Sequence, residues 1–191
     1  MKAYKEIEPA EIWEAPSVRE GSNYTLDSIL EEMSPFSLDQ GDVPLIVKLV
    51  ENPSYKTATL FGGAVDLFSH DCIHATLGRG LGVKDEAFVI GYTMGSTKRM
   101  ARWRRNLFMF CAKYLYPEGY KFGEDERLVF YNAVMAGSKC PSDLSKVDFR
   151  HHLTSTPYYI RIKLGIEEDI LKSCYELERN LFRESYESQR L

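Results

Sequence analysis

The sequence predicts an all-α fold in which one helical domain makes up most of the chain. Apolar residues recur at helical spacing over long stretches, whereas the alternating pattern of β-strands is scarce. The 191 residues are one domain's worth, and a composition of 44% hydrophobic and 27% charged residues is typical of globular proteins. We therefore expect an N-terminal segment over 1–22 that wraps the surface, followed by a single helical domain over 23–191.

Helix boundaries follow from capping residues and prolines along the chain. Asn23 or Thr25 can cap a short helix that continues through Met33, and Ser34–Pro35 interrupts it. Proline just inside a helix start is favoured, so Asp42–Pro44 predicts the next helix, which includes the apolar stretch 45–50. Further helices are expected at about 59–77, 86–116, 124–136, 155–164 and 167–185.

A glycine-rich turn separates two of these helices. Gly78-Arg79-Gly80-Leu81-Gly82 places three glycines in five positions, which supplies the unusual backbone angles of a tight return. Asp85 can cap the following helix, with Glu86 in its first turn, where carboxylates are favoured. That helix is expected to run to about Tyr116, and Pro117 ends it.

His70, Asp71, His74 and Glu86 form the pattern most indicative of a metal site. The two histidines, at i and i+4, lie on one helix face, and the turn lets Glu86 return to the same point. Asp71 is rotated by about 100° from His70, so it is either a fourth ligand or a group that fixes a histidine tautomer. This ligand set suits zinc first, and also iron or manganese. The alternative is a pair of helix histidines hydrogen-bonded to nearby carboxylates without a metal.

The same residues carry a resemblance to a known family. His70-Asp71-x-x-His74-x11-Glu86 resembles the signature of the coenzyme Q (ubiquinone) biosynthesis family of the fourth Coq protein. Gly78 follows the second histidine at the family's spacing. Arg161-Ile162-Lys163-Leu164-Gly165-Ile166 is similar to the family's closing element, and Ala136-Gly137 precedes it. The resemblance covers roughly 61–166.

The resemblance implies an all-helical protein at the membrane face of the quinone-synthesising assembly, with other quinone-biosynthesis proteins as partners. It implies a lyase activity, the oxidative removal of the C1 carboxyl group from a prenylated ring with a bound metal, and a place for an isoprenoid lipid. Carried over residue by residue, His70, Asp71, His74 and Glu86 are the metal site and the catalytic residues. A metal there would act as a Lewis acid on the carboxylate of a prenylated 4-hydroxybenzoate-like ring.

Two other functions fit part of the pattern. The first is a scaffold that binds prenyl lipid and uses the metal only structurally. The second is a metal-dependent hydrolase of the His-Asp type, which needs additional, well-separated His and Asp ligands. His151 and His152 are the histidines left for that role, and adjacent residues on a helix point about 100° apart. We expect these two to be structural or surface residues.

A basic run could meet anionic membrane lipid. Five cations fall in eight positions around Trp103, a residue type that favours membrane interfaces, and they are Lys98, Arg99, Arg102, Arg104 and Arg105. The more usual explanation of such a run is a solvated helix face. The net charge of −4 argues against a nucleic-acid partner.

Cysteine usage and the N-terminal segment indicate the compartment. Cys72, Cys111, Cys140 and Cys174 form no CxxC pair, which indicates neither a zinc ribbon nor a disulfide framework and suits a reducing environment. The acidic start resembles neither a secretory signal nor a transit peptide, and no run approaches the length of a membrane span. We expect a cytoplasmic protein, either free or peripheral at the inner membrane face.

Two further groups are expected to serve packing. Gly91 and Gly95 fall at i and i+4, where they let a second helix or an isoprenoid tail approach the backbone closely, and helix packing is the favoured explanation. An aromatic cluster is most economically part of the core, and a pocket for a quinone head is the weaker alternative. Its members are Phe108, Phe110, Tyr114, Tyr116, Tyr120 and Phe122.

Overall fold

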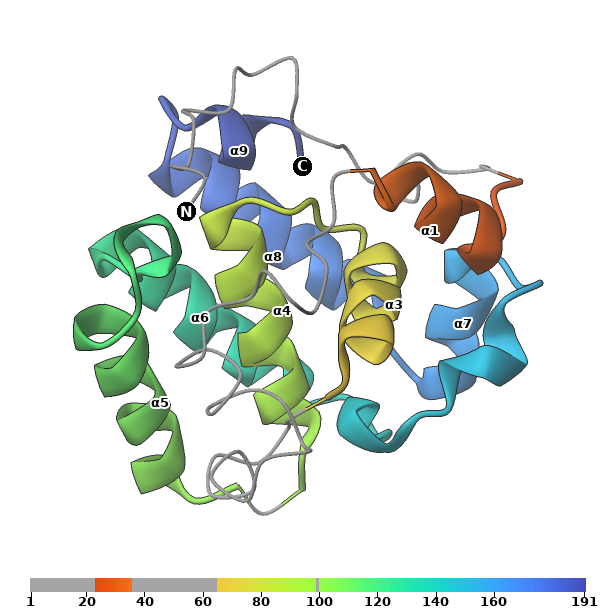
Figure 1. Ribbon diagram of the computed structural model, residues 1–191, viewed down its shortest axis with the longest axis horizontal. Coiled ribbons are helices and arrows are strands. Elements are labelled where there is room, and N and C mark those ends of the chain that lie inside the picture. Colours follow the sequence, from red (N-terminus) through yellow and green to blue (C-terminus); the bar gives the residue numbers. More distant parts are fainter. Residues whose placement is uncertain (1–22, 36–64, 99) are drawn as a thin grey trace.

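The computed structural model describes residues 23–35, 65–98 and 100–191. In these ranges every regular element is a helix and no strand occurs, which confirms the all-α fold (Figure 1). The helix expected around 45–50, the N-terminal segment 1–22 and Arg99 lie outside the described residues. The α-helices are α1 (Leu26–Met33), α3 (Leu67–Leu77), α4 (Val83–Ser96), α5 (Arg102–Tyr114), α6 (Glu124–Gly137), α7 (Pro157–Leu164), α8 (Glu168–Leu181) and α9 (Tyr186–Gln189). Short 3₁₀ turns form η4 (Glu118–Tyr120), η5 (Leu144–Lys146) and η6 (Phe149–His152).

Helices α4 and α6 lie side by side at the centre of the fold because glycines remove the side chains between them. A Cβ at Gly91 would lie 2.5 Å from the carbonyl oxygen of Phe130. A Cβ at Gly95 would collide with the carbonyl of Val134, and Gly137 on α6 makes the reciprocal approach to α4. This contact confirms the close helix packing expected for Gly91 and Gly95.

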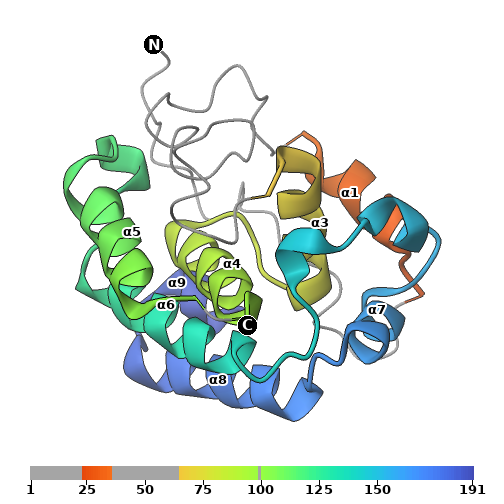
Figure 2. The ribbon, with the colours of Figure 1, turned by 90° about the horizontal axis from the view of Figure 1, so that it is seen from below.

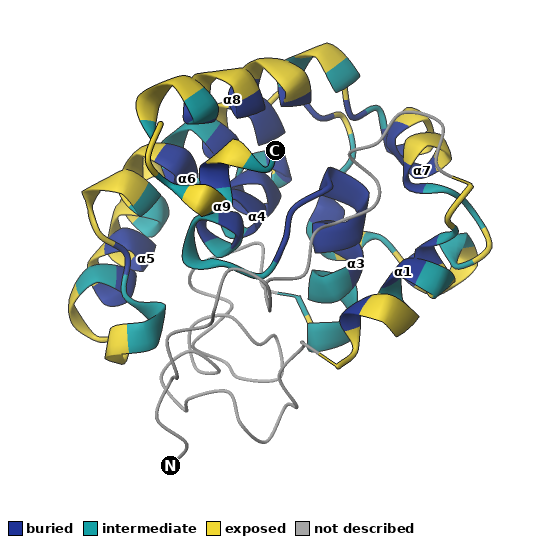
Figure 3. Ribbon diagram, turned by 90° about the horizontal axis from the view of Figure 1, so that it is seen from above, coloured by how far each residue is buried: buried dark blue, intermediate teal, exposed yellow. Residues whose placement is uncertain are grey.

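The other helices surround this pair (Figure 2). Helix α5 lies at one edge, where Phe108 stacks on Phe130 of α6 with ring centroids 5.3 Å apart. Helix α3 packs against α4 and in turn contacts α1 and α7, while α8 packs against α6. Figure 3 shows buried faces turned inward and exposed faces outward, as a shared hydrophobic core requires.

Helices α1 and α3 begin at side-chain caps. Thr25 caps α1, because its Oγ1 accepts the N–H three residues on at 3.3 Å, so Thr25 fills the role that Asn23 could also have filled. Asp66 has an extended backbone and caps α3 in the same way, at 2.7 Å. Helix α3 therefore begins at Leu67, so the helix expected from about residue 59 does not continue through Val65 and Asp66, and residues 59–64 lie outside the described ranges.

The single helix expected over 86–116 is also wrong, because α4 ends at Ser96 and the backbone of Thr97 is extended. The Oγ of Ser96 accepts the N–H of Leu144 at 3.1 Å. The Oγ1 of Thr97 donates to Asp143 at 3.2 Å. Such side-chain bonds compete with the helical backbone pattern. A new helix, α5, begins at Arg102.

Later elements follow the sequence more closely. Helix α6 matches the expected 124–136 to within one residue, and α7 lies inside the expected 155–164. The helix expected over 167–185 is shorter than expected, since α8 ends at Leu181, and the short α9 begins beyond it at Tyr186. None of the helices in the described ranges is long and apolar enough to cross a membrane.

The aromatic cluster belongs to the core only in part. Phe108, Tyr116 and Phe122 are buried as expected, and Tyr120 packs partly buried against the core. Phe110 and Tyr114 are exposed, so the expectation is wrong for these two. They lie on the outward face of α5, the side opposite to Phe108.

Candidate metal centre

Helix α3 presents His70 and His74 on one face. The two residues are four positions apart, so their rings are neighbours, with centroids 4.6 Å apart. The helix ends at Gly78, whose φ of 72° is left-handed and imposes no strain on glycine. The chain then turns back over 79–82 and enters α4.

Glu86 comes from the first turn of α4. Gly82 is the N-cap of that helix, and Asp85 lies three residues later, where its carboxylate accepts the N–H of Gly82 at 3.0 Å. The expectation that Asp85 is the N-cap is therefore wrong. Helix α4 begins at Val83, so Asp85 is its third residue, and its side chain reaches back to the N-cap Gly82. Glu86 keeps its expected first-turn position.

The carboxylate of Glu86 joins the two imidazoles. Its Oε2 lies 3.3 Å from the Nε2 of His70, and its Oε1 lies 3.3 Å from the Nε2 of His74. One ligand atom from each residue lies within 4.8 Å of the others, so the group could hold a metal ion. The His74 side chain is fully buried, whereas those of His70 and Glu86 are 17% and 31% exposed. His74 thus holds the group from the protein interior, and His70 and Glu86 make it accessible from one side.

A backbone contact determines which nitrogen of His74 faces Glu86. The Nδ1 of His74 lies 2.6 Å from the carbonyl oxygen of Gly80, which can only accept, so Nδ1 carries the proton. In the neutral ring Nε2 then has a lone pair, and it faces a carboxylate oxygen without the alignment of a hydrogen bond. In that state the two electron-rich atoms repel each other, and either a bound cation or a second proton on the ring would relieve the repulsion. A carbonyl on the other ring nitrogen is also the usual partner of a metal-binding histidine.

The electrostatics favour an ionised Glu86. Burial by itself would raise the pKa of this carboxyl, but its charge and hydrogen-bond interactions with the imidazoles of His74 and His70 hold that pKa well below its usual range. A bound divalent cation would act in the same direction. The site therefore offers a carboxylate to a cation.

Asp71 does not belong to this group of three residues. It directly follows His70, so its side chain leaves α3 about 100° away. Burial raises the pKa of Asp71, while charge on His70 and His74 acts to lower it. Its role as a fourth ligand, or as a group that orients a histidine, stays a prediction.

Sequence reasoning missed a buried charge cluster behind the turn. Arg79 is fully buried, and its guanidinium lies 3.0 Å from Asp85 and 2.9 Å from Glu178. These contacts fix the turn that carries the Gly80 carbonyl, and with it the orientation of His74. The sequence signal was an arginine inside a glycine-rich turn, which by itself does not reveal burial.

The C-terminal residues complete the cluster. Glu187 accepts two N–H groups in the first turn of α4, at 2.7 and 3.1 Å, and Arg190 pairs with Asp85. A Cβ at Gly80 would collide with Arg190, and one at Gly82 would collide with Glu187. Gly80 and Gly82 therefore permit the close approach of Arg190 and Glu187 to the backbone of the turn. Of the three glycines, Gly78 has the expected unusual backbone angle, a positive φ.

The cysteines and the other two histidines do not belong to the metal-binding group. All four cysteines are buried and free, in agreement with the expected absence of disulfides, and burial raises the pKa of each thiol. His151 is exposed beside Asp148, 3.4 Å away, and His152 is half-buried. Neither belongs to a possible metal-binding group among the described residues.

Comparison with known proteins assigns the chain to no family. No protein-family model matches it, and no curated protein or solved structure matches it either. The resemblance to the quinone-biosynthesis family therefore rests on the motif residues, and the candidate metal group rests on its own geometry.

Proposed function

We propose that the protein binds one divalent metal ion, zinc in the first instance, through His70, His74 and Glu86. The observation that carries this proposal is the placement of buried His74, whose Nδ1 lies 2.6 Å from the Gly80 carbonyl oxygen while its Nε2 lies 3.3 Å from a Glu86 oxygen. Imidazole and carboxylate ligands suit zinc, and also iron or manganese. Three protein ligands leave a further position open, as in catalytic zinc sites.

The proposed reaction is the oxidative removal of the C1 carboxyl group from a prenylated 4-hydroxybenzoate-like ring, in which the carboxyl leaves as CO₂, a hydroxyl from water takes its place, and an external two-electron oxidant accepts the electrons. The ion, when bound, supplies Lewis-acid polarisation of the substrate carboxylate. His70 and Glu86 are partly exposed, so a substrate can approach from that side, while buried His74 holds the site from within. Support comes from the ligand chemistry and from the motif spacing that the chain shares with the quinone-biosynthesis family.

A prenyl-lipid-binding scaffold with a structural metal is the second candidate. Structural zinc sites are usually closed by four protein ligands, whereas the group described here supplies three and is accessible from one side. That accessibility favours chemistry over a purely structural role. A hydrolase of the His-Asp type gains no support, since no second group of metal ligands occurs in the described part of the chain. A phosphatase screen tests this last alternative.

Elemental analysis of protein purified without added metal tests the site. We expect about one equivalent of divalent metal in the parent and its loss in His74→Ala. His151→Ala is the matched control, because His151 is an exposed histidine outside the group, and it should keep the metal. Less than about a tenth of an equivalent in the parent, unchanged by metal soaking, would contradict the proposal.

Complementation of a quinone-deficient strain tests the reaction. The parent and His151→Ala should restore quinone synthesis, and His70→Ala should not. Full complementation by His70→Ala, with prenyl-lipid binding intact, would instead favour the scaffold.

A further inference from the structure

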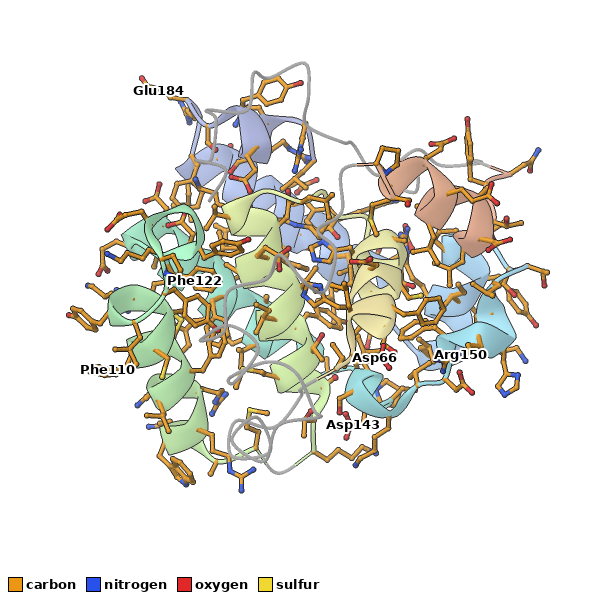
Figure 4. The ribbon with its side chains drawn as sticks, viewed as in Figure 1. Asp66, Phe110, Phe122, Asp143, Arg150 and Glu184 are labelled. Atoms are coloured by element: carbon orange, nitrogen blue, oxygen red, sulfur yellow. The ribbon has the colours of Figure 1, made fainter. Side chains whose placement is uncertain are left out.

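Helix α5 turns a second apolar face to the outside of the molecule. Its inner face, with Phe108, Met109 and Ala112, is buried in the core. On the outer face four large side chains are exposed by 36% to 61%, and they are Trp103, Leu107, Phe110 and Tyr114. At about 100° per residue these four fall within about 60° of arc and form a continuous line, the α5 stripe. Figure 4 shows Phe110 at the outer edge of α5, pointing away from the other helices.

Cations lie on both borders of the α5 stripe. Arg102 lies about 100° to one side of Trp103 and Arg104 about 100° to the other. The guanidinium of Arg104 is 5.5 Å from the centre of the Trp103 ring system. Helix α5 contains no acidic residue, and among the described residues no carboxylate forms an ion pair with Arg102 or Arg104. Both charges are therefore available to an external anion.

The remaining members of the basic run are placed differently. Arg105 lies about 200° from Trp103, on the side of α5 that faces the core, and its Nε is buried. Lys98 is exposed but precedes the helix. Within the described residues, Arg102 and Arg104 are the members of the run that border the stripe.

We propose that the α5 stripe is a docking surface for an anionic lipid bilayer. Its aromatic and aliphatic side chains would enter the interfacial layer, while Arg102 and Arg104 would meet headgroup phosphates. Charge argues against a second copy on the same face, because α5 contains no acidic residue and two such faces would bring together only cations. Single exposed apolar residues need no explanation, but a continuous line bordered by cations does. The proposal does not depend on a metal at His74.

Trp103 can report on this docking directly. The chain has two tryptophans, so Trp13→Phe leaves Trp103 as the sole indole. With vesicles of phosphatidylcholine and phosphatidylglycerol in equal parts, Trp103 emission should shift to shorter wavelength and be quenched by brominated acyl chains. Added salt should weaken the binding, since surface charge is screened beyond about 8–10 Å at physiological ionic strength. Emission that does not change with these vesicles, or binding that ignores lipid charge, overturns the proposal.

Sedimentation with the same vesicles separates the α5 stripe from other exposed aromatics. Phe110→Glu should weaken binding by at least about tenfold, because it replaces an apolar group with an anion. Tyr158→Glu is the matched control, since Tyr158 is a comparably exposed aromatic residue on α7, and it should bind like the parent. Equal binding by Phe110→Glu and the parent overturns the proposal. A parent dimer that Phe110→Glu dissociates, without any vesicle binding, also overturns it and assigns the stripe to a second copy.

Discussion

Arg79 and Glu178 form a bidentate ion pair across 99 positions of sequence. The Nη1 of Arg79 donates to one carboxylate oxygen of Glu178 at 2.9 Å, and its Nη2 donates to the other at 3.1 Å. Both side chains are buried, and Asp85 lies 3.0 Å from the Nε of the same guanidinium. The pair joins α8 to the turn between α3 and α4. The positions of His74 and Glu86 therefore depend on a helix that contributes no ligand.

Replacing Arg79 with methionine should lower the free energy of unfolding by about 3–5 kcal/mol, because Glu178 would keep a buried carboxylate without its main counter-charge. Arg79→Lys should recover only part of this loss, since an ammonium cannot make the bidentate pair. Urea denaturation of the metal-free proteins measures both.

Arg150→Met is the control for the loss of an arginine ion pair. Arg150 lies 3.5 Å from Asp148 at the surface, so this change should cost less than about 1 kcal/mol. Similar effects of Arg79→Met and Arg150→Met would show that the buried pair does not stabilise the turn.

The close approach of α4 and α6 gives a second prediction. Gly95→Val should destabilise the protein by several kcal/mol, on the order of the upper range for overpacking, because the new Cβ would collide with the backbone carbonyl of Val134. Met135→Val, at an exposed position on α6, also introduces a β-branched residue into this helix pair and should cost less than about 1 kcal/mol. Thermal unfolding of the two variants and the parent measures these costs. A well-folded Gly95→Val with an unchanged melting temperature would exclude the close packing of α4 against α6.

Local chemistry explains which parts of the fold the sequence could predict. Thr25 and Gly78 act through bonds to residues within a turn of the helix, so the end of α3 and the start of α1 are readable from the sequence. The break after Ser96 is not, because it depends on Asp143 and Leu144, more than forty positions later. Tertiary contacts of this kind override a continuous helical pattern.

The same distinction applies to the site. The spacing of His70 and His74 places both rings on one helix face, and a short turn returns Glu86 to them, so these three are predictable. The burial of Arg79 depends on Glu178, 99 positions away, and leaves no local trace.

Glu187 should give the stability of the protein a dependence on pH. Burial and the nearby charge of Asp85 raise the pKa of Glu187 from 4.5 to about 7. Because this folded-state pKa lies above the unfolded value, the stabilisation is complete below about pH 4.5 and is lost as the pH rises through about 7. Glu187→Gln can still accept the two N–H groups of α4 but carries no charge.

The variant should therefore be more stable than the parent near pH 8, by roughly 1–3 kcal/mol, and the difference should vanish toward about pH 4. Urea denaturation of metal-free protein across this range measures it. If the free energies of unfolding of the parent and Glu187→Gln change with pH in the same way, Glu187 is not the group whose titration changes the stability.

Glu86 should matter more for metal binding than for folding. Its carboxylate is partly exposed in the first turn of α4, where the helix dipole contributes only about 0.3–1 kcal/mol, so metal-free Glu86→Gln should stay folded. A neutral amide is a poor replacement for a carboxylate ligand, so metal affinity should fall by about tenfold or more. Thermal melts of the metal-free proteins and zinc titration separate the two effects, with Glu184→Gln, an exposed carboxylate beyond α8, as the control. If Glu86→Gln binds zinc like the parent, Glu86 serves only to favour the start of the helix. The ligand set would then shrink to the two histidines, with Asp71 as the next residue to replace.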